Sequence, residues 1–585
     1  MDLKKIPQKW FLVLLLILAV LGSALGFYLF PEQNVSREEN EKKPAEENVQ
    51  EKTVISEEKL NKIINSLSLE QKVGQLFLLG FHSQKPSSEW LEFVRENNIG
   101  GIFFNSLSLS SLDELRALTA QNQGMDARGI PYFFAVSQEG GGQEAFSEGV
   151  TFFPSNMALA AAKDEKIAYE AGHITGRELK ALGINLNLGP VLDILSDKEK
   201  SFIGSRAFAD NPAAVALFGM RYLAGLQNTG IAGAVKYFPG LGGTSTNPEY
   251  AVPVITAKKE ELLNHALQPF AEAVKQKAAA VVVGHGLYVQ IDPRYPASLS
   301  DKVIRGLLRS SSGFNYHGLV ITDDLSKKAV ADNPGVAPSA VQAIKAGADI
   351  IFIRSGFSAE KSAYQAVIKA VRNGEISEEQ INTSLKRILQ AKFKYCLLNK
   401  EKQNFLWEKV GSTPSRQKAE EIAELSVTLV KKSEGLLPLK KEDKILVLTP
   451  DELPSAHMPS YLAELLEKDY PNLSYKQFTN YHEEEEKKEI RTLAGASDVI
   501  VVMTFNAGPN QASLVKDLLA LENKQVIAAA VGNPFDLALF PDVPTYFAVY
   551  SACPASLKVL ADILSGEKTA KGELPVAMEV QKLTD

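Results

Sequence analysis

The sequence predicts an α/β fold: a TIM (β/α)8 barrel followed by a smaller three-layer α/β sandwich domain. Eight short apolar runs between residues 73 and 356 are each followed by a stretch that suits a helix, the repetition typical of a parallel barrel. The runs are almost continuously apolar, as expected of strands covered on both faces. Four later runs, separated by helix-length segments, predict the second domain.

The N-terminus predicts a membrane anchor. Lysines precede an apolar run over residues 10–30, and a helix needs about 20 residues to cross a bilayer. Positive charge before the run places residues 1–9 in the cytoplasm and the body outside the cell membrane, as a single-pass protein. A cleaved secretory signal is the alternative. Residues 31–56, rich in Glu, Lys, Asn and Gln, predict a disordered tether.

The barrel domain is expected over residues 57–400. Its predicted strands are the runs VGQLFLLGF (73–81), IGGIFF (99–104), YFFAVSQ (132–138), INLNLGPVLDI (184–194), IAGAVKYF (231–238), AAVVVGH (279–285), GLVITDD (318–324) and ADIIFIRSG (348–356). A helical connection is expected over 401–425 and the C-terminal α/β domain over 426–585. The strands predicted in that domain are 444–450, 498–505, 525–534 and 545–551.

Composition excludes several kinds of partner. The net charge of -7, with no cluster of basic and aromatic residues, argues against nucleic acid. Cys396 and Cys553 show no metal-ligand spacing, and no G-x-x-x-x-G-K-S/T phosphate loop occurs. The sequence therefore predicts neither a metal site nor a cofactor.

Chemically capable side chains end several of the predicted strands. In a parallel barrel, the carboxyl ends of the strands form the mouth where sites are built. The candidates for one pocket are Gln138, Glu139, Asp193, Lys236, His285 and Asp323.

Several segments carry a family resemblance. They are LSLEQKVGQLFLLGF (67–81), GINLNLGPVLDI (183–194), FIGSRAF (202–208), AVKYFPGLGGTS (234–245), ITDDLS (321–326) and AGADIIFI (346–353). In this order they resemble the signature stretches of glycoside hydrolase family 3, in its bacterial β-N-acetylglucosaminidase branch. SVTLVKKSEGLLPLK (426–440), AVGNPFDL (530–537) and KGELPV (571–576) are similar to the C-terminal domain of its two-domain members. The resemblance implies amino-sugar glycans, such as cell-wall fragments, as substrates.

The resemblance also implies roles for individual residues. Enzymes of this kind retain configuration and use a carboxylate nucleophile together with an acid/base group. Asp323 matches the nucleophile, and Arg206 and Lys236 match residues that hold sugar hydroxyls. Asp193 and His285 match recurring positions that bind substrate or orient the site; we expect them among the substrate-binding residues.

Two departures from the family pattern put turnover in doubt. The family stretch K-H-F-P-G-H-G with a following Asp-x-His acid/base pair reads KYFPGLGGTSTNPEY (236–250) here, so that Asn247 and Glu249 replace the pair. The clamp D-Q-E-G-G-R-V-x-R reads SQEGGGQEA (137–145), which lacks its Asp and both Arg. Glu249 is the expected substitute acid/base; a glutamate from the cluster Glu483 to Glu486 is the alternative.

Two functions therefore stay open. One is a retaining β-N-acetylhexosaminidase with weak or lost turnover. The other is a non-catalytic, membrane-anchored relative that binds a glycan or a protein. The sequence identifies no protein partner.

Overall fold

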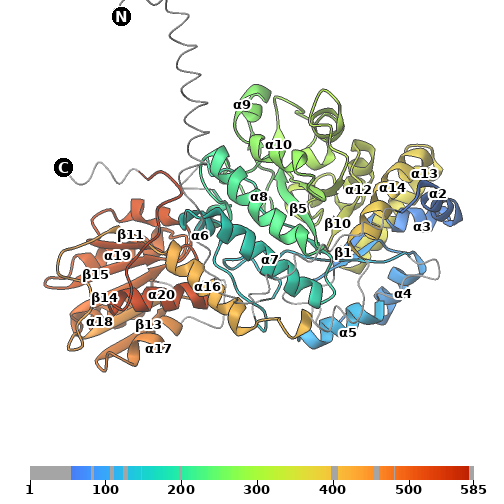
Figure 1. Ribbon diagram of the computed structural model, residues 1–585. Coiled ribbons are helices and arrows are strands. Elements are labelled where there is room, and N and C mark those ends of the chain that lie inside the picture. The colour runs from blue at the N-terminus through green and yellow to red at the C-terminus, as the bar shows by residue number, and fades with distance from the viewer. Residues whose placement is uncertain are drawn as a thin grey trace, which may run out of the picture. The chain divides into compact units, whose positions relative to one another are not determined.

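The structure, a computed structural model, describes residues 55–80, 85–105, 111–122, 130–146, 148–196, 201–396, 406–451, 453, 460–479 and 481–578 (Figure 1). The expected cytoplasmic segment and anchor, and the tether up to residue 54, lie outside these residues. Within the described ranges, no helix combines the length and apolar character needed to span a membrane.

Eight parallel strands form the barrel, in the order β10-β1-β2-β3-β4-β5-β7-β9. Strand β1 pairs with both β2 and β10, and one bridge between Ile321 and Ile350 joins β9 to β10, so the sheet wraps round on itself. The predicted TIM barrel is therefore confirmed. The strands are β1 Phe77–Gly80, β2 Gly101–Phe103, β3 Phe133–Val136, β4 Leu186–Asn187, β5 Ala232–Phe238, β7 Ala280–Val283, β9 Leu319–Thr322 and β10 Ile351–Ile353.

Helices surround these strands, and a short pair, β6 Val254–Ile255 and β8 Leu287–Tyr288, lies outside the barrel sheet. The α-helices are α2 Glu57–Ser66, α3 Leu69–Gly74, α4 Ser88–Glu96, α5 Leu112–Asn122, α6 Asn156–Ala161, α7 Glu165–Ala181, α8 Pro212–Asn228, α9 Lys259–Asn264, α10 Gln268–Lys275, α11 Lys328–Ala331, α12 Val336–Ala346, α13 Phe357–Arg372 and α14 Glu378–Tyr395. Short 3₁₀ turns cover Gly204–Arg206 and Ala297–Leu299, and a π-helical segment covers Lys302–Arg309.

Helices α7 and α8 run side by side on the outside of the barrel (Figure 1). Glycines make this close approach possible: a Cβ atom on Gly172 would lie 2.2 Å from the Tyr222 carbonyl oxygen, and one on Gly225 would lie 2.1 Å from that of Tyr169. Any larger residue at either position would force the two backbones apart.

Strand β4 is much shorter than the predicted run of residues 184–194. Pro190 has no N–H to donate to a neighbouring strand. The Asn187 side chain takes over the pairing at the strand end, where its amide accepts from the Gln138 N–H (2.8 Å) and donates to the Gln138 carbonyl (2.9 Å). These two hydrogen bonds tie the loop after β3 to the barrel mouth.

The C-terminal domain is built on a six-stranded sheet in the order β11-β16-β15-β14-β12-β13. Its strands are β11 Thr428–Lys431, β12 Ile445–Pro450, β13 Leu473–Phe478, β14 Val499–Thr504, β15 Gln525–Ala530 and β16 Thr545–Ala548. Its helices are α16 Thr413–Ser426, α17 Tyr461–Glu467, α18 Glu484–Gly495, α19 Pro509–Leu519 and α20 Pro554–Leu564, with a 3₁₀ segment over Pro534–Leu539.

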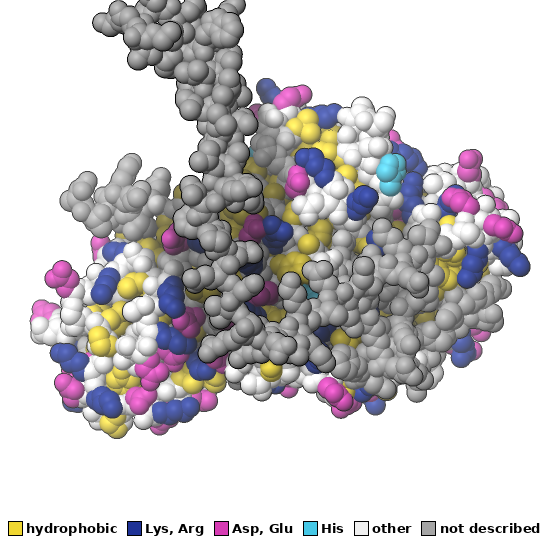
Figure 2. All heavy atoms as spheres, viewed as in Figure 1, with side chains coloured by type: hydrophobic (Ala, Val, Ile, Leu, Met, Phe, Trp, Pro, Cys, Tyr) yellow, Lys and Arg dark blue, Asp and Glu magenta, His cyan; other side chains and the backbone are white. Residues whose placement is uncertain are grey.

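Helices cover both faces of this sheet. On β12, Ile445 and Val447 belong to the core that includes α17 and α20, whereas Leu446 and Leu448 pack with α18 and α19. The predicted three-layer arrangement is therefore confirmed. In the face shown in Figure 2, acidic and basic side chains are interspersed over this domain.

Two strands of this sheet are missing from the sequence prediction. Strands β11 and β13 are the two edges, and β11 is antiparallel to β16. Their side chains are mostly half-buried, and β13 carries polar residues such as Lys476 and Gln477. Edge strands lack the continuous apolar character on which the prediction depended.

Candidate functional site

A cavity of about 480 Å³ lies at the carboxyl ends of the barrel strands. It is lined by residues that end or follow β2, β3, β5, β9 and β10, as well as by the loop after β4. The predicted site residues Arg206, Lys236, Glu249 and Asp323 all line it. The structure therefore brings these four side chains into one cavity.

Asp323 directly follows β9 and is buried. Its Oδ1 accepts the N–H of Asp324 at 2.8 Å, and its Oδ2 accepts from Lys327 Nζ at 2.9 Å. Burial raises the pKa of Asp323, but the Lys327 ammonium, together with His285 and the Asp324 N–H, outweighs burial and lowers that pKa to about 2. Asp323 is therefore ionised at neutral pH, as a nucleophile requires.

Arg206 and Lys236 share one carboxylate, that of Glu139. The guanidinium of Arg206 makes two bonds of 2.9 Å to Glu139, and Lys236 Nζ lies 2.5 Å from Oε1 of the same residue. Burial raises the pKa of Glu139, whereas the two cations lower it to about 2. Arg206 also donates to the Tyr237 hydroxyl at 2.8 Å. Both cations are thus held rigidly in the wall of the cavity.

Glu249 lies at the mouth with 40% of its side chain exposed. Its Oε1 is 3.5 Å from Lys327 Nζ and 3.4 Å from Arg354 Nη2. The Arg354 Nε in turn donates to Asp324 at 2.6 Å. One ammonium group, that of Lys327, thus contacts the carboxylates of both Asp323 and Glu249.

Asp193 and His285 are buried but do not appear in the lining of this cavity. Asp193 accepts the N–H groups of Tyr237 (3.0 Å) and Leu241, and burial raises its pKa to about 6. The His285 ring contacts the Ser298 hydroxyl (2.8 Å) and the Asp324 carbonyl (2.9 Å). The structure gives both residues backbone partners in the loops around the site, and their expected substrate-binding role stays a prediction.

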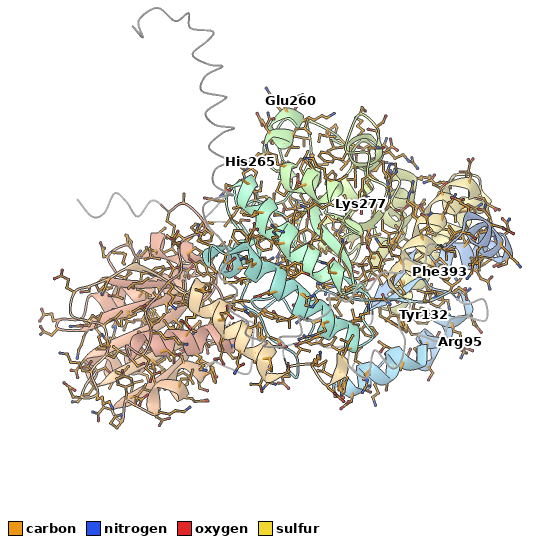
Figure 3. The ribbon with its side chains drawn as sticks, in the orientation of Figure 1. Arg95, Tyr132, Glu260, His265, Lys277 and Phe393 are labelled. Atoms are coloured by element: carbon orange, nitrogen blue, oxygen red, sulfur yellow. The ribbon has the colours of Figure 1, made fainter. Side chains whose placement is uncertain are left out.

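No histidine is present in the described lining of the cavity. His265, labelled in Figure 3, lies just after α9, where its Nε2 is 3.1 Å from the Ser196 hydroxyl.

Sequence reasoning missed Lys327 and Arg354 and left Glu139 without a role. Lys327 follows Asp323 by four residues, a spacing that brings side chains together in a helical turn and could have indicated the pair. Arg354 lies within the last predicted strand of the barrel and directly follows β10 in the structure. Its partners Glu249 and Asp324 are 105 and 30 residues away, so no local pattern could reveal them.

Comparisons with known proteins agree with this geometry. The family described as "Glycosyl hydrolase family 3 N terminal domain" matches residues 68–391. The solved glycoside hydrolase family 3 β-N-acetylglucosaminidase from Paenibacillus sp. str. FPU-7 is 34% identical with a TM-score of 0.82, and the match covers 88% of this chain and 100% of that one.

Two curated relatives extend the comparison. β-Hexosaminidase A of Pseudoalteromonas piscicida is 27% identical over 66% of this chain and 71% of its own length. A β-hexosaminidase of Idiomarina loihiensis is 31% identical over 44% of this chain and 76% of its own length. With its two-domain architecture, the chain belongs to glycoside hydrolase family 3, in the bacterial β-N-acetylglucosaminidase branch.

Proposed function

We propose that this protein is a retaining β-N-acetylhexosaminidase that acts on amino-sugar glycans of the cell wall, with slow turnover. The observation that carries the proposal is the position of Asp323 at the end of β9, in one cavity with Arg206 and Lys236. The relatives named above as β-N-acetylglucosaminidase and β-hexosaminidases support the substrate class.

In the proposed reaction, an oxygen of Asp323 attacks the anomeric carbon while the bond to the leaving oxygen breaks. Glu249 gives its proton to that oxygen and then takes a proton from the water that releases the sugar from Asp323. Arg206 and Lys236 donate hydrogen bonds to sugar hydroxyls, in positions set by Glu139.

The slow rate follows from the surroundings of Glu249. A general acid must present a protonated oxygen to the leaving group, whereas Glu249 Oε1 faces Lys327 and Arg354. Ser137 and Gly142, which line the cavity, also offer fewer charged contacts than the Asp and Arg that the family has there. These same features favour the second candidate, a relative that binds glycan without hydrolysing it.

Hydrolysis of two aryl N-acetyl-β-glucosaminides tests the acid/base assignment. We expect Glu249→Gln to lower kcat/KM about 10²-fold or more for a nitrophenyl substrate, because general acid catalysis typically contributes 10²- to 10⁴-fold. A dinitrophenyl substrate needs little acid assistance, so its rate should change much less. The control is Glu260→Gln on α9, an exposed position labelled in Figure 3.

Equal losses on both substrates would contradict the role of Glu249. If the wild type binds N-acetylglucosamine in calorimetry but hydrolyses neither substrate, the binding function replaces the enzymatic one. An aryl β-glucoside used in parallel checks that the acetamido group is recognised.

We also propose that residues 10–30 anchor the protein and that its body lies outside the cell membrane, from the apolar length and the preceding lysines. Protease added to intact cells should degrade the body while the membrane stays closed. Protection of the body until the membrane is broken would contradict this topology. Release of the whole body into the medium would instead identify a cleaved signal.

A further inference from the structure

A single buried lysine, Lys327, lies between the two carboxylates of the proposed reaction. Its Nζ is 2.9 Å from Asp323 Oδ2, 3.5 Å from Glu249 Oε1 and 5.5 Å from the centre of the Tyr237 ring. Only 10% of its side chain is exposed. Solvent therefore screens these charge interactions poorly.

The turn that carries Lys327 is held on several sides. The Lys327 N–H donates to the Asp324 carbonyl at 3.1 Å, and the Asp324 carboxylate accepts from the N–H and hydroxyl of Ser326 at 3.0 and 2.6 Å. Two residues further on, the Ala329 N–H donates to the carbonyl of Pro248, next to Glu249. The backbone therefore keeps the ammonium group close to Asp323.

The other cations of the cavity pair with carboxylates other than Asp323. Arg206 and Lys236 pair with Glu139, and Arg354 pairs with Asp324. Lys327 is left with Asp323 as its close partner, because its distance to the half-exposed Glu249 is longer. Breaking the contact between Lys327 and Asp323 would therefore leave two charged groups without their close partner in a part of the cavity wall that water hardly reaches.

This pairing affects the attacking atom directly. One oxygen of the carboxylate that must attack the anomeric carbon accepts a charge-assisted hydrogen bond from Lys327, which withdraws electron density from that carboxylate. The transition state of glycoside cleavage also carries positive charge on the sugar, and a second positive charge nearby raises its energy.

We propose that Lys327 is a positioning residue that acts through Asp323: its ion pair restrains the nucleophile and limits the rate at which the covalent glycosyl–Asp323 bond forms. The inference rests on the proposed function, because it concerns the first step of that reaction.

The rate of covalent labelling measures this step without needing Glu249. An activated N-acetylglucosaminyl fluoride bearing fluorine at C5 forms a bond from its anomeric carbon to an Asp323 oxygen and releases fluoride, and the adduct is followed by the mass of the intact protein. We expect Lys327→Met to label about tenfold faster or more than the wild type at pH 7. Lys328→Met, which removes the exposed neighbouring lysine, should label at the wild-type rate.

The pH profile separates this role from a merely structural one. Because Lys327, with smaller contributions from His285 and the Asp324 N–H, lowers the pKa of Asp323 to about 2, wild-type labelling should stay nearly constant from pH 7 down to pH 4. Without the lysine, burial is expected to raise the pKa of Asp323, so labelling of Lys327→Met should fall several-fold or more over the same interval. Lys327→Arg, which keeps the charge, should restore the flat profile.

A melting measurement shows whether loss of folding explains the result. Lys327→Met leaves a buried carboxylate unpaired, whereas Asp323→Asn combined with Lys327→Met does not, so the double variant should melt at a higher temperature than the single one.

Labelling of Lys327→Met at the wild-type rate and with a flat pH profile would overturn the inference. So would absence of labelling in both proteins when the variant is folded. Failure of the wild type to bind N-acetylglucosamine in calorimetry would instead count against the proposed function.

Discussion

Replacement of Glu139 with Gln is expected to lower the free energy of unfolding by about 3 to 5 kcal/mol at pH 7, the usual result of removing one partner of a buried ion pair. Glu139 is the shared carboxylate of Arg206 and Lys236, whose side chains are only 18% and 4% exposed. Without it, two positive charges remain side by side in the cavity wall. Urea unfolding followed by circular dichroism measures the change.

The effect of Glu139→Gln should depend on pH in a defined direction. The folded state lowers the pKa of Glu139 from 4.5 to about 2 through Arg206 and Lys236, against the opposing effect of burial. A lowered pKa adds stability above the unfolded value, and this stability is lost as the pH falls towards 2. The difference between wild type and variant should therefore shrink from pH 5 to pH 3.

The exposed substitution Glu260→Gln serves as the control and should change stability by less than about 0.5 kcal/mol. If Glu139→Gln were as stable as this control at pH 7, Glu139 would not be the counterion that holds the two cations. A deficit that stays constant from pH 5 to pH 3 would also contradict the ion-pair explanation.

The second large effect concerns Asp323. Asp323→Asn is expected to lower hydrolysis of the dinitrophenyl N-acetylglucosaminide at least about 10³-fold, because an amide cannot form the covalent intermediate. The same variant should give no adduct with the activated fluoride. Its binding of N-acetylglucosamine should remain measurable, because Arg206 and Lys236 keep their contacts with Glu139.

Asp332→Asn is the matched control, since Asp332 is exposed at the end of α11 in the same segment of the chain. Hydrolysis by Asp323→Asn that equals hydrolysis by this control would refute the nucleophile assignment. A folded Asp323→Asn variant that also fails to bind the sugar would show that Asp323 contributes to binding rather than to chemistry alone.

The sequence by itself was sufficient to predict the barrel and the four interior strands of the second sheet. Strands covered on both faces are almost continuously apolar, so β7 and β14 can be recognised without any tertiary information. The edge strands β11 and β13 were missed because their side chains are mostly half-buried, so these strands lack a continuous apolar run. The domain boundaries predicted from composition stay predictions.

The sequence also indicated which residues share the mouth, since strand ends of a parallel barrel meet there. Arg206, Lys236, Glu249 and Asp323 do line one cavity. Asp193 and His285 bond to neighbouring backbone groups and are not among the lining residues of this cavity. Their substrate-binding role stays a prediction.

Only the tertiary structure decided how the charges of the site pair. Glu139 meets Arg206 across 67 residues of sequence, and Glu249 meets Arg354 across 105. Ion pairs form between groups that folding brings within a few ångströms, and their strength depends on burial, which no local pattern encodes. For the same reason, the sequence identifies Asp323 as a carboxylate at the barrel mouth, whereas only the fold shows that this carboxylate forms an ion pair with Lys327.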